Sequence, residues 1–319
     1  MSTSPAAQGA RLHWDELPDV VRAAVRASLG ADVVAADTQA HGFSPGVAAR
    51  LRLADGSRAF VKAVSASTNA EAPEMHRAEA RLAQAFTAAV PAPRLLDVYD
   101  DGEWVALTYE DVEGRHPSMP WRMDELEHVV DSLGRLHESL TPCPVADLSR
   151  AVDDEDNIAE FASWSALRQN PPDAGLDEWT RAHLDELAGL EAGWRDAADG
   201  DTLLHLDLRA DNMLIRPSGD VVFVDWPWGS RGAPLLDVVG FAPSVAMQGG
   251  PDIDWLVARH PMTRAAAPEA VNALLAAVAG MFTYRALQPP PPGLPTLRVF
   301  QDAQGQVARR MLADRMGNR

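Results

Sequence analysis

The sequence predicts a mixed α+β fold in which antiparallel strands come first and helices form most of the rest. Residues 47–53 and 57–64 are two strand-like runs joined by a turn at Asp55 and Gly56, which is the pattern of a β-hairpin. Apolar residues return at helical spacing later in the chain, most clearly in residues 123–140. With 319 residues and 46% hydrophobic content, the chain can bury one large core or two lobes.

The first third of the chain is expected to place helices on either side of this hairpin. Residues 14–28 are expected to form a leading helix. Residues 74–86 carry apolar side chains at intervals that put them roughly on one helical face. Residues 104–109 are rich in β-branched and aromatic side chains, which favours a further strand. The first third is therefore predicted to be a small sheet accompanied by helices.

The remaining part is predicted to be mainly helical, with one hairpin in its middle. Residues 213–215 and 221–224 are short apolar runs on either side of Pro-Ser-Gly-Asp, a sequence that favours a turn. Residues 269–288 and 296–315 are two further helices, separated by a stiff proline-rich connector.

The most informative stretch is His-Leu-Asp-Leu-Arg-Ala-Asp-Asn at residues 205–212, with Asp225 at the end of the hairpin. The spacing of Asp207 and Asn212 suits a short loop that presents one side chain to a hydroxyl group and the other to a metal. The hairpin would return Asn212 and Asp225 to the same end of two neighbouring strands. Two adjacent oxygen ligands suit Mg²⁺, which proteins hold with few side chains plus substrate phosphates. The pattern indicates phosphoryl transfer to a hydroxyl group, and a solvated polar loop is the alternative.

One lysine, Lys62, stands among the 28 lysine and arginine residues of the chain. Codon bias explains why lysine is scarce, but it does not explain why this position keeps it. A compact ammonium group and a planar guanidinium group are not interchangeable where a phosphate fits a tight site. The position of Lys62 on the second strand of the hairpin therefore marks it as a functional residue.

The motif H-x-D-x-x-x-x-N, followed by a strand that ends in Asp, resembles the catalytic and metal loops of the protein-kinase-like fold. His-Leu-Asp and Asp-Trp are more similar to the aminoglycoside phosphotransferase family than to protein kinases, which would show His-Arg-Asp and Asp-Phe-Gly. Residues 133–137 and 232–238 resemble further motifs of that family. The resemblance implies a two-lobed fold, with a nucleotide-binding N-lobe of residues 1–112 and a mainly helical, catalytic C-lobe of residues 113–319.

The same resemblance implies roles for the residues of the motif. Asp207 would be the base that accepts the proton of the acceptor hydroxyl, and Arg209 would supply positive charge inside the loop. Asn212 and Asp225 would be the Mg²⁺ ligands. Lys62 would hold the α- and β-phosphates of the nucleotide.

Further nucleotide contacts are expected near Lys62. Glu79 is the expected carboxylate partner of the lysine, with Glu74 as the second candidate and a solvated helix carboxylate as the alternative. Two glycines around a serine after His41 suit backbone contact with phosphates, although an ordinary hairpin turn has the same composition. In the resembled fold, the segment around residues 110–112 is the hinge between the lobes, and its backbone groups hold the nucleotide base. Backbone contacts leave little trace in side chains, so the expected donor is ATP or GTP. The predicted nucleotide-binding residues are Lys62, Glu79, Gly42, Ser44, Gly46, Glu110 and Val112.

The formal charge of −18 bears on the partners of the protein. It argues against nucleic acid and anionic membranes, and it is compatible with a cationic substrate. Asp153, Asp154 and Asp156 form an acidic patch that would bind such a substrate, or would be a solvated loop. Trp226 and Trp228 would stack on the acceptor, or would fill the core between the lobes. The basic residues 308–315 depart from aminoglycoside kinases, which tend to be acidic near the C-terminus.

The sequence has no apolar run of bilayer length, no signal-peptide pattern at its start and a single cysteine, Cys143. A cytoplasmic monomer or homodimer is therefore expected. The predicted function is transfer of the nucleotide γ-phosphate to a hydroxyl group of a small molecule, with an antibiotic as the acceptor and resistance as the role. The alternatives are a kinase of choline, homoserine or a sugar, a nucleotide-binding pseudoenzyme, and, as the least favoured, a protein kinase.

Overall fold

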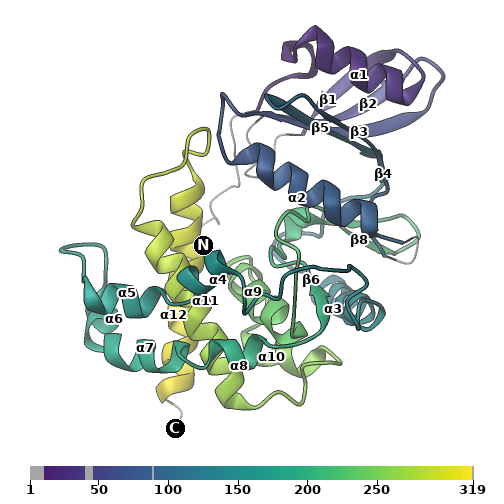
Figure 1. Ribbon diagram of the computed structural model, residues 1–319. Coiled ribbons are helices and arrows are strands. Elements are labelled where there is room, and N and C mark those ends of the chain that lie inside the picture. The colour runs from purple at the N-terminus through teal and green to yellow at the C-terminus, as the bar shows by residue number, and fades with distance from the viewer. Residues whose placement is uncertain (1–10, 40–45, 88–89, 318–319) are drawn as a thin grey trace.

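The computed structural model has a small lobe built on a sheet and a larger helical lobe, and it describes residues 11–39, 46–87 and 90–317 (Figure 1). The predicted α+β class and two-lobed arrangement are confirmed. The chain leaves the sheet after β5 (Trp104–Glu110) and enters the helical lobe at α3 (Met123–Ser139). The exact boundary between residues 112 and 113 stays a prediction.

The small lobe contains a five-stranded antiparallel sheet in the order β1-β2-β3-β5-β4. The predicted hairpin forms, with Ala48 opposite Lys62 across β2 and β3. Its turn contains Gly56 at a φ of +87°, a left-handed conformation that favours glycine. The strands before β5 are β1 (Val33–Thr38), β2 (Val47–Leu53), β3 (Arg58–Ser65) and β4 (Leu95–Asp100).

Alternation along the strands divides the small lobe into two cores, because successive side chains point to opposite faces of a sheet. Val61 and Ala63 pack in the cluster that includes residues of α1 (Asp19–Leu29). Phe60 packs on the other face, in the cluster that includes residues of α2 (Ala72–Ala85). Lys62 lies on this second face, which is the one turned toward the helical lobe in Figure 1.

The predicted leading helix of residues 14–28 is a short 3-10 helix, η1 (Trp14–Glu16), followed by α1. Pro18 occupies the N-cap of α1 with extended backbone. Proline has no backbone N–H and cannot continue a helix from the preceding turn, so the chain begins a new helix after it. The apolar spacing of the segment did not reveal this break.

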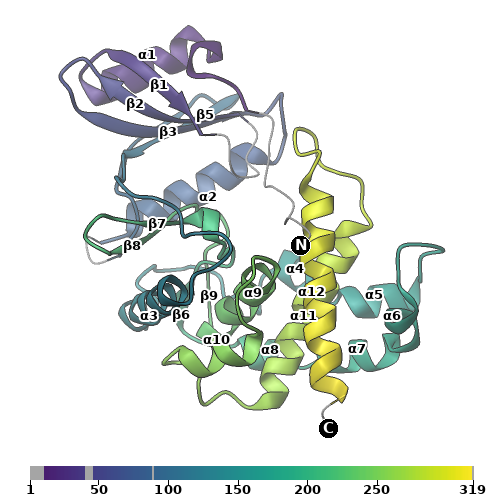
Figure 2. The same ribbon diagram turned by 180° about the vertical axis from the view of Figure 1, so that it is seen from behind.

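The helical lobe is held by one large core to which α3, α9 (Pro234–Met247) and the two C-terminal helices contribute. The long helices α11 (Pro268–Ala286) and α12 (Leu297–Gly317) lie side by side in both views (Figures 1 and 2). They correspond to the predicted residues 269–288 and 296–315. None of the helices in the described part of the chain combines the length and the apolar composition that crossing a membrane requires.

Five short helices between residues 155 and 198 were not predicted as helices. Each has at most eight residues, so the apolar period of 3.6 residues has little length in which to show itself. They are α4 (Glu155–Glu160), α5 (Ser163–Gln169), α6 (Glu178–Ala182), α7 (Leu184–Glu191) and α8 (Trp194–Ala198). A further short helix, α10 (Ile253–Arg259), follows α9.

The central hairpin forms as predicted and positions the loop of residues 205–209. β7 (Met213–Ile215) pairs with β8 (Val221–Phe223) in antiparallel fashion. The loop lies between β6 (Thr202–Leu204) and a 3-10 turn, η2 (Ala210–Asn212), which leads directly into β7. β6 in turn pairs with β9 (Ser230–Gly232), so both ends of the motif are fixed by strands.

Candidate active site

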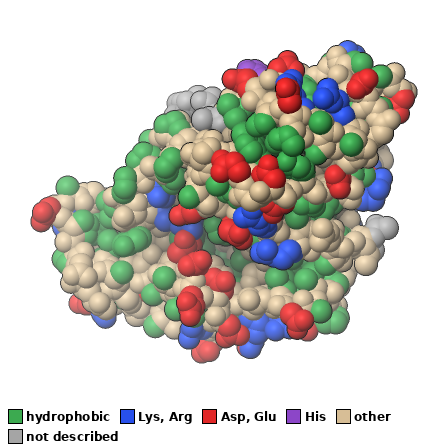
Figure 3. Space-filling view, turned by 45° about the horizontal axis from the view of Figure 1, so that its top comes forward, with side chains coloured by type: hydrophobic (Ala, Val, Ile, Leu, Met, Phe, Trp, Pro, Cys, Tyr) green, Lys and Arg blue, Asp and Glu red, His purple; other side chains and the backbone are tan. Residues whose placement is uncertain are grey.

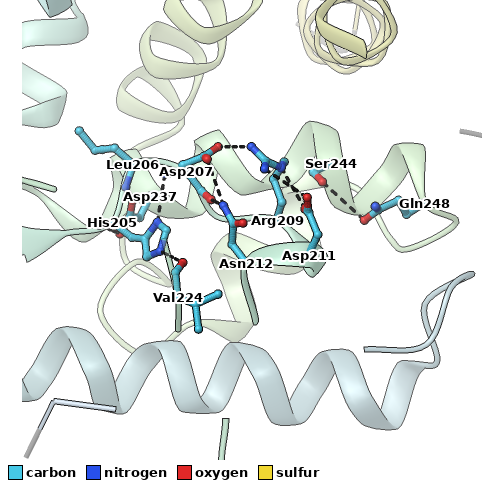
Figure 4. A network of polar contacts seen from close by, with 10 residues as sticks. All are labelled: His205, Leu206, Asp207, Arg209, Asp211, Asn212, Val224, Asp237, Ser244 and Gln248. Atoms are coloured by element: carbon cyan, nitrogen blue, oxygen red, sulfur yellow. Dashed lines mark hydrogen bonds and ion pairs between the residues drawn. The ribbon is translucent and has the colours of Figure 1, made fainter. Parts of the chain in front are cut away.

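Asp207 lies in the loop after β6, and two neighbours hold its carboxylate (Figure 4). Arg209 Nη1 donates to Asp207 Oδ1 at 2.5 Å, and Asn212 Nδ2 donates to Asp207 Oδ2 at 3.0 Å. A quarter of the Asp207 side chain remains exposed, so a substrate can reach it. Burial raises the pKa of Asp207 to about 6, although the Arg209 charge acts to lower it. Asp207 is therefore a carboxylate that can take up a proton near neutral pH.

Arg209 is itself fixed between two carboxylates. Besides Asp207 it contacts Asp211, with a distance of 3.0 Å between Arg209 Nε and Asp211 Oδ1. Its guanidinium carbon lies 5.9 Å from the ring centroid of Phe300, which brings α12 next to the loop. These contacts direct Arg209 at Asp207 and orient that side chain.

The loop backbone has an unusual conformation at Leu206, and Asp237 of α9 holds it there. Leu206 has a φ of +60°, a left-handed conformation that a non-glycine residue adopts only where its surroundings impose it. Asp237, in the first turn of α9, accepts hydrogen bonds from the backbone N–H groups of His205 at 2.9 Å and Leu206 at 2.7 Å. A buried carboxylate that receives two backbone donors can therefore impose this conformation.

Two buried histidines, His137 and His260, form a series of hydrogen bonds that ends at Asp237. The backbone N–H of Met262 donates to His260 Nδ1 at 3.3 Å, so the neutral ring of His260 carries its proton on Nε2. Burial first, and then the adjacent His137, lower the pKa of His260 to about 4. His260 Nε2 therefore donates to His137 Nδ1 at 3.1 Å, and His137 Nε2 donates to Asp237 Oδ2 at 3.0 Å. Each of these two hydrogen bonds is donated in the direction of Asp237, the carboxylate that holds the loop.

Lys62 joins the small lobe to the loop after β8. Its Nζ lies 2.8 Å from Glu79 Oε1 on α2 and 2.6 Å from Asp225 Oδ1. Burial acts to lower the pKa of Lys62, but the carboxylates of Asp225 and Glu79 outweigh it and raise the pKa above its usual value. For Asp225, burial acts to raise the pKa, but the Lys62 and Arg209 charges outweigh it and lower it. The lysine is a cation and Asp225 is a carboxylate at neutral pH.

The donor set near Lys62 fits a hard cation such as Mg²⁺. Asn212 Nδ2 is occupied by Asp207, so the amide presents its oxygen as the remaining ligand. Asp225 has a φ of +69°, in the left-handed region, at the end of the hairpin. In the part of the chain that the structure describes, no group of three or more His, Cys, Asp or Glu residues could hold a metal. Asn212 and Asp225 thus suit an ion that takes most of its ligands from phosphates and water.

One cavity runs from the hinge between the lobes to Lys62 and the end of the hairpin. Its hinge end is lined by the apolar or aromatic Phe60, Tyr109 and Val112 together with the charged Arg50, Glu110 and Asp111, and its other end is lined mainly by charged residues. Figure 3 shows charged side chains of both signs around the hollow between the lobes. Residues at the charged end are Arg11, Lys62, Glu79, Asp211, Asn212 and Asp225.

The hinge is fastened to the sheet by a buried carboxylate. The Asp111 side chain is 3% exposed and lies 2.7 Å from Arg58 Nη2 and 3.5 Å from Arg50 Nε. Arg50 also donates to the carbonyl oxygen of Val112 at 3.3 Å. These contacts fix the direction in which the chain leaves β5.

The structure brings most of the predicted nucleotide-binding residues together around this cavity. Glu110 and Val112 line its hinge end, and Lys62 and Glu79 line its charged end. Gly46 has a φ of +103°, and a Cβ atom on it would lie 2.3 Å from the Ala63 carbonyl oxygen, so only glycine fits there. The predicted contacts at Gly42 and Ser44 lie outside the described residues.

The residues predicted to contact the acceptor are not gathered at one place. Trp226 is 2% exposed, and its indole N–H donates to the Phe223 carbonyl oxygen at 2.9 Å. Its ring contacts the rings of Phe86 and His205 in the core, and it also lines the cavity. Trp228 is 45% exposed and is absent from the cavity wall, as are the three aspartates of the acidic patch.

The acidic patch lies at the start of a helix, with Asp153 and Asp156 exposed to solvent. Its last residues begin α4, and Asp154 caps this helix by accepting a hydrogen bond from the backbone N–H of Asn157 at 2.9 Å. Asp153 Oδ2 lies 4.0 Å from Arg150 Nη1. A carboxylate before a helix satisfies an N–H group that has no partner within the helix, which gives Asp154 a structural role.

Sequence reasoning missed three functional positions. Asp111 at the hinge and His260 below the loop are buried polar residues whose partners lie far away in the sequence. Arg11 lines the cavity although it precedes the first helix. No local pattern marks Arg11 or His260, whereas an acidic residue directly after a hinge strand was a usable signal for Asp111.

Comparisons with known proteins agree with this arrangement. The structure is similar to a spectinomycin phosphotransferase solved with ADP and spectinomycin, with a TM-score of 0.62 and 11% identity over 93% of this chain and 99% of that chain. It is similar to a thermostable mutant of the aminoglycoside phosphotransferase APH(4)-Ia solved with AMP-PNP and hygromycin B, with a TM-score of 0.60 and 12% identity over 93% and 98% of the two chains. It is also similar to choline kinase LicA from Streptococcus pneumoniae, with a TM-score of 0.63 and 12% identity over 92% and 98%.

At these identities the structural likeness establishes a shared fold, the two-lobed kinase-like fold that the motifs predicted. No protein with a curated description matches the sequence at a significant level. Residues 40–290, which include Lys62, Asp207 and Asp225, match the model of the phosphotransferase enzyme family.

Proposed function

Since the chain belongs to the phosphotransferase enzyme family, it is a small-molecule phosphotransferase, and we propose that it transfers the γ-phosphate of ATP to a hydroxyl group placed at Asp207. The observation that carries this proposal is the meeting of Lys62, Asn212 and Asp225 at one end of a cavity whose hinge end carries the aromatic side chains of Phe60 and Tyr109. Asp207 is next to this group, because its Oδ2 lies 3.0 Å from Asn212 Nδ2. A flat base and a chain of phosphates match the two ends of this cavity.

Each residue near the phosphates has a distinct task in this proposal. Lys62, held by Glu79 and Asp225, places a positive charge beside the phosphates. Asn212 and Asp225 present one amide oxygen and one carboxylate to Mg²⁺. When bound, this ion would neutralise part of the negative charge on the phosphate oxygens.

Asp207 orients the acceptor and receives its proton. The exposed quarter of the Asp207 side chain would contact the hydroxyl group of the acceptor. Arg209 and Asn212 fix the direction of its carboxylate oxygens. Because its pKa is raised to about 6, the carboxylate is deprotonated at neutral pH and still close enough in pKa to accept a proton. The rate gain comes mainly from positioning and from charge stabilisation, since phosphoryl transfer asks for little covalent chemistry from the protein.

ATP is the donor that we favour over GTP. Three of the solved structures of similar fold contain ADP or the ATP analogue AMP-PNP. The hinge of this chain offers backbone groups next to Glu110 and Val112, and these groups give no preference for either base. Nucleotide consumption with ATP and with GTP, measured at equal concentration, decides between the two donors.

A hydroxylated antibiotic is the acceptor that we propose, with resistance as the biological role. Two of the similar structures carry hygromycin B or spectinomycin, and the net charge of −18 suits a cationic compound. A metabolic alcohol of the choline, homoserine or sugar type is the second candidate, supported by the likeness to a choline kinase.

A panel of acceptors tests the proposal and separates the two candidates. Purified protein is incubated with ATP, Mg²⁺ and one compound at a time, and ADP formation is followed together with the mass of the product. A mass increase of one phosphate on an antibiotic supports the first candidate, and the same increase on a metabolic alcohol supports the second. Loss of ADP formation in Asp207→Asn is required in either case. Failure of every hydroxyl compound to accept phosphate would refute the function proposed here.

A further inference from the structure

Arg11 reaches the charged end of the cavity from a segment that precedes the first helix. It lines the cavity together with Lys62, Asn212 and Asp225. It also precedes residues 40–290, the part of the chain that matches the family model. Arg11 is therefore an addition to the site that lies outside the matched part of the chain.

The backbone around Arg11 is tied to the start of β2. Arg11 forms a parallel bridge with Gly46, and the N–H of Leu12 donates to the Gly46 carbonyl oxygen at 3.0 Å. The conformation of Gly46 is one that only glycine fits, as shown above. These contacts attach the segment to the hairpin that carries Lys62, so Arg11 moves with the nucleotide-binding lobe.

Electrostatics place the guanidinium at the phosphate end of the cavity. Burial lowers the pKa of Arg11, and the carboxylate of Asp225 acts to raise it. The pKa of His76 on α2 is lowered to about 3, by burial first, then by the Lys62 charge and, to a smaller extent, by the Arg11 charge. Arg11 therefore acts on the same two groups, Asp225 and His76, that surround Lys62.

The site needs a further cation when a nucleotide is bound. Lys62 is shared by Glu79 and Asp225, and Arg209 is held by Asp207 and Asp211. Four carboxylates thus face two cations before any phosphate arrives. A nucleoside triphosphate adds several negative charges, and an arginine fork is well suited to bind phosphate oxygens in a bidentate way.

We propose that Arg11 is a second phosphate-binding cation, which contacts the terminal phosphates of ATP and acts alongside Lys62. The inference rests on the proposed nucleotide site and adds to it a residue from outside the matched part of the chain. A phosphate contact affects the binding of ATP and leaves the binding of adenosine unchanged. A residue that only stabilises the N-terminal segment would affect both to the same degree.

Calorimetric titration with ATP, ADP and adenosine in the presence of Mg²⁺ tests this directly. Arg11→Ala is expected to weaken ATP binding by about 10- to 100-fold, the size of a lost charge-assisted hydrogen bond, and to leave adenosine binding unchanged. Arg11→Lys is expected to restore part of the affinity, since it keeps the charge and loses the fork. Arg26→Ala removes an exposed arginine of the same lobe and serves as the matched control, with wild-type affinities.

Two results would overturn the role of Arg11 while leaving the proposed function intact. One is unchanged ATP affinity in Arg11→Ala, and the other is an equal loss of ATP and adenosine binding, which indicates a structural role. Thermal unfolding of each variant checks that the lobe remains folded. If the unmodified protein binds neither ATP nor adenosine, the proposed function fails, and the inference on Arg11 fails with it.

Discussion

Lys62 Nζ lies 2.6 Å from Asp225 Oδ1, which joins β3 of the small lobe to the end of the hairpin in the helical lobe. The two residues are 163 positions apart in the sequence. Because the same ammonium group also contacts Glu79 on α2, one cation holds three elements in a single arrangement. The charged end of the cavity is therefore assembled from residues of both lobes.

The buried pair of Lys62 and Glu79 gives a prediction on stability. Lys62→Met leaves Glu79, whose side chain is 5% exposed, without its partner. An uncompensated buried charge costs about 3–5 kcal/mol, and we expect the free energy of unfolding to fall by this order in chemical denaturation. The double variant Lys62→Met with Glu79→Gln should recover most of the loss, because the buried charge is then gone. Equal stability of the single and double variants would contradict this account.

Replacing the proposed base tests catalysis separately from binding. Asp207→Asn keeps the shape of the side chain, but its amide has one acceptor oxygen for the two donors Arg209 and Asn212, and it cannot accept a proton. We expect kcat to fall by about 10²- to 10⁴-fold while the affinity for ATP stays the same. Asp185→Asn, at a side chain that is 93% exposed, is the matched control and should keep full activity. Near-normal turnover in Asp207→Asn would remove this residue from the role of base.

The pKa of Asp207 predicts the acid limb of the pH profile. Protonation abolishes the ability of Asp207 to accept the hydroxyl proton, so kcat/KM should decline as the pH falls below about 6. The Arg209 charge favours the carboxylate, and its removal in Arg209→Gln should raise the pKa of Asp207 and move this limb to higher pH. Arg122→Gln, at a side chain that is 64% exposed, should leave the profile unchanged. A limb that stays in place in Arg209→Gln would show that Asp207 is not the group that titrates.

The histidine chain below the loop predicts an effect on turnover from a distance. His260→Phe removes the donor to His137 Nδ1 and leaves a buried acceptor unpaired, at a cost of about 1–3 kcal/mol. Because His137 supports Asp237, and Asp237 holds the backbone of Leu206, we expect kcat to decrease while the KM for ATP is unchanged. His260→Gln supplies an amide donor and should recover part of kcat.

A neighbouring threonine provides the control for this experiment. Thr263 is buried in the same turn, and its hydroxyl donates to the Val257 carbonyl oxygen at 2.9 Å. Thr263→Val should lower the free energy of unfolding to a similar degree without lowering kcat, because this bond does not lead to the loop. If both variants lose turnover in proportion to stability, the histidine chain has only a structural role.

Local patterns allowed much of the site to be predicted. The hairpin of residues 47–64 and the one that ends at Asp225 follow from turn residues and strand propensity, and both form. The long helices α3, α11 and α12 begin and end within two residues of the prediction, because α3 carries a clear amphipathic period and the other two are long segments on either side of a proline run. The short helices of residues 155–198 carry no such period and were missed.

The sequence by itself determined the elements and the chemical groups of this protein, including the loop with Asp207 and the strand with its only lysine. The tertiary structure alone decided which groups meet. It brought Lys62 to Asp225, Arg58 to Asp111 and His260 to His137, and it placed Arg11 at the charged end of the cavity. It also buried Trp226 in the core and used Asp154 as a helix cap. The physical reason is that turns and helices depend on neighbouring residues, whereas contacts between distant residues depend on how whole elements pack.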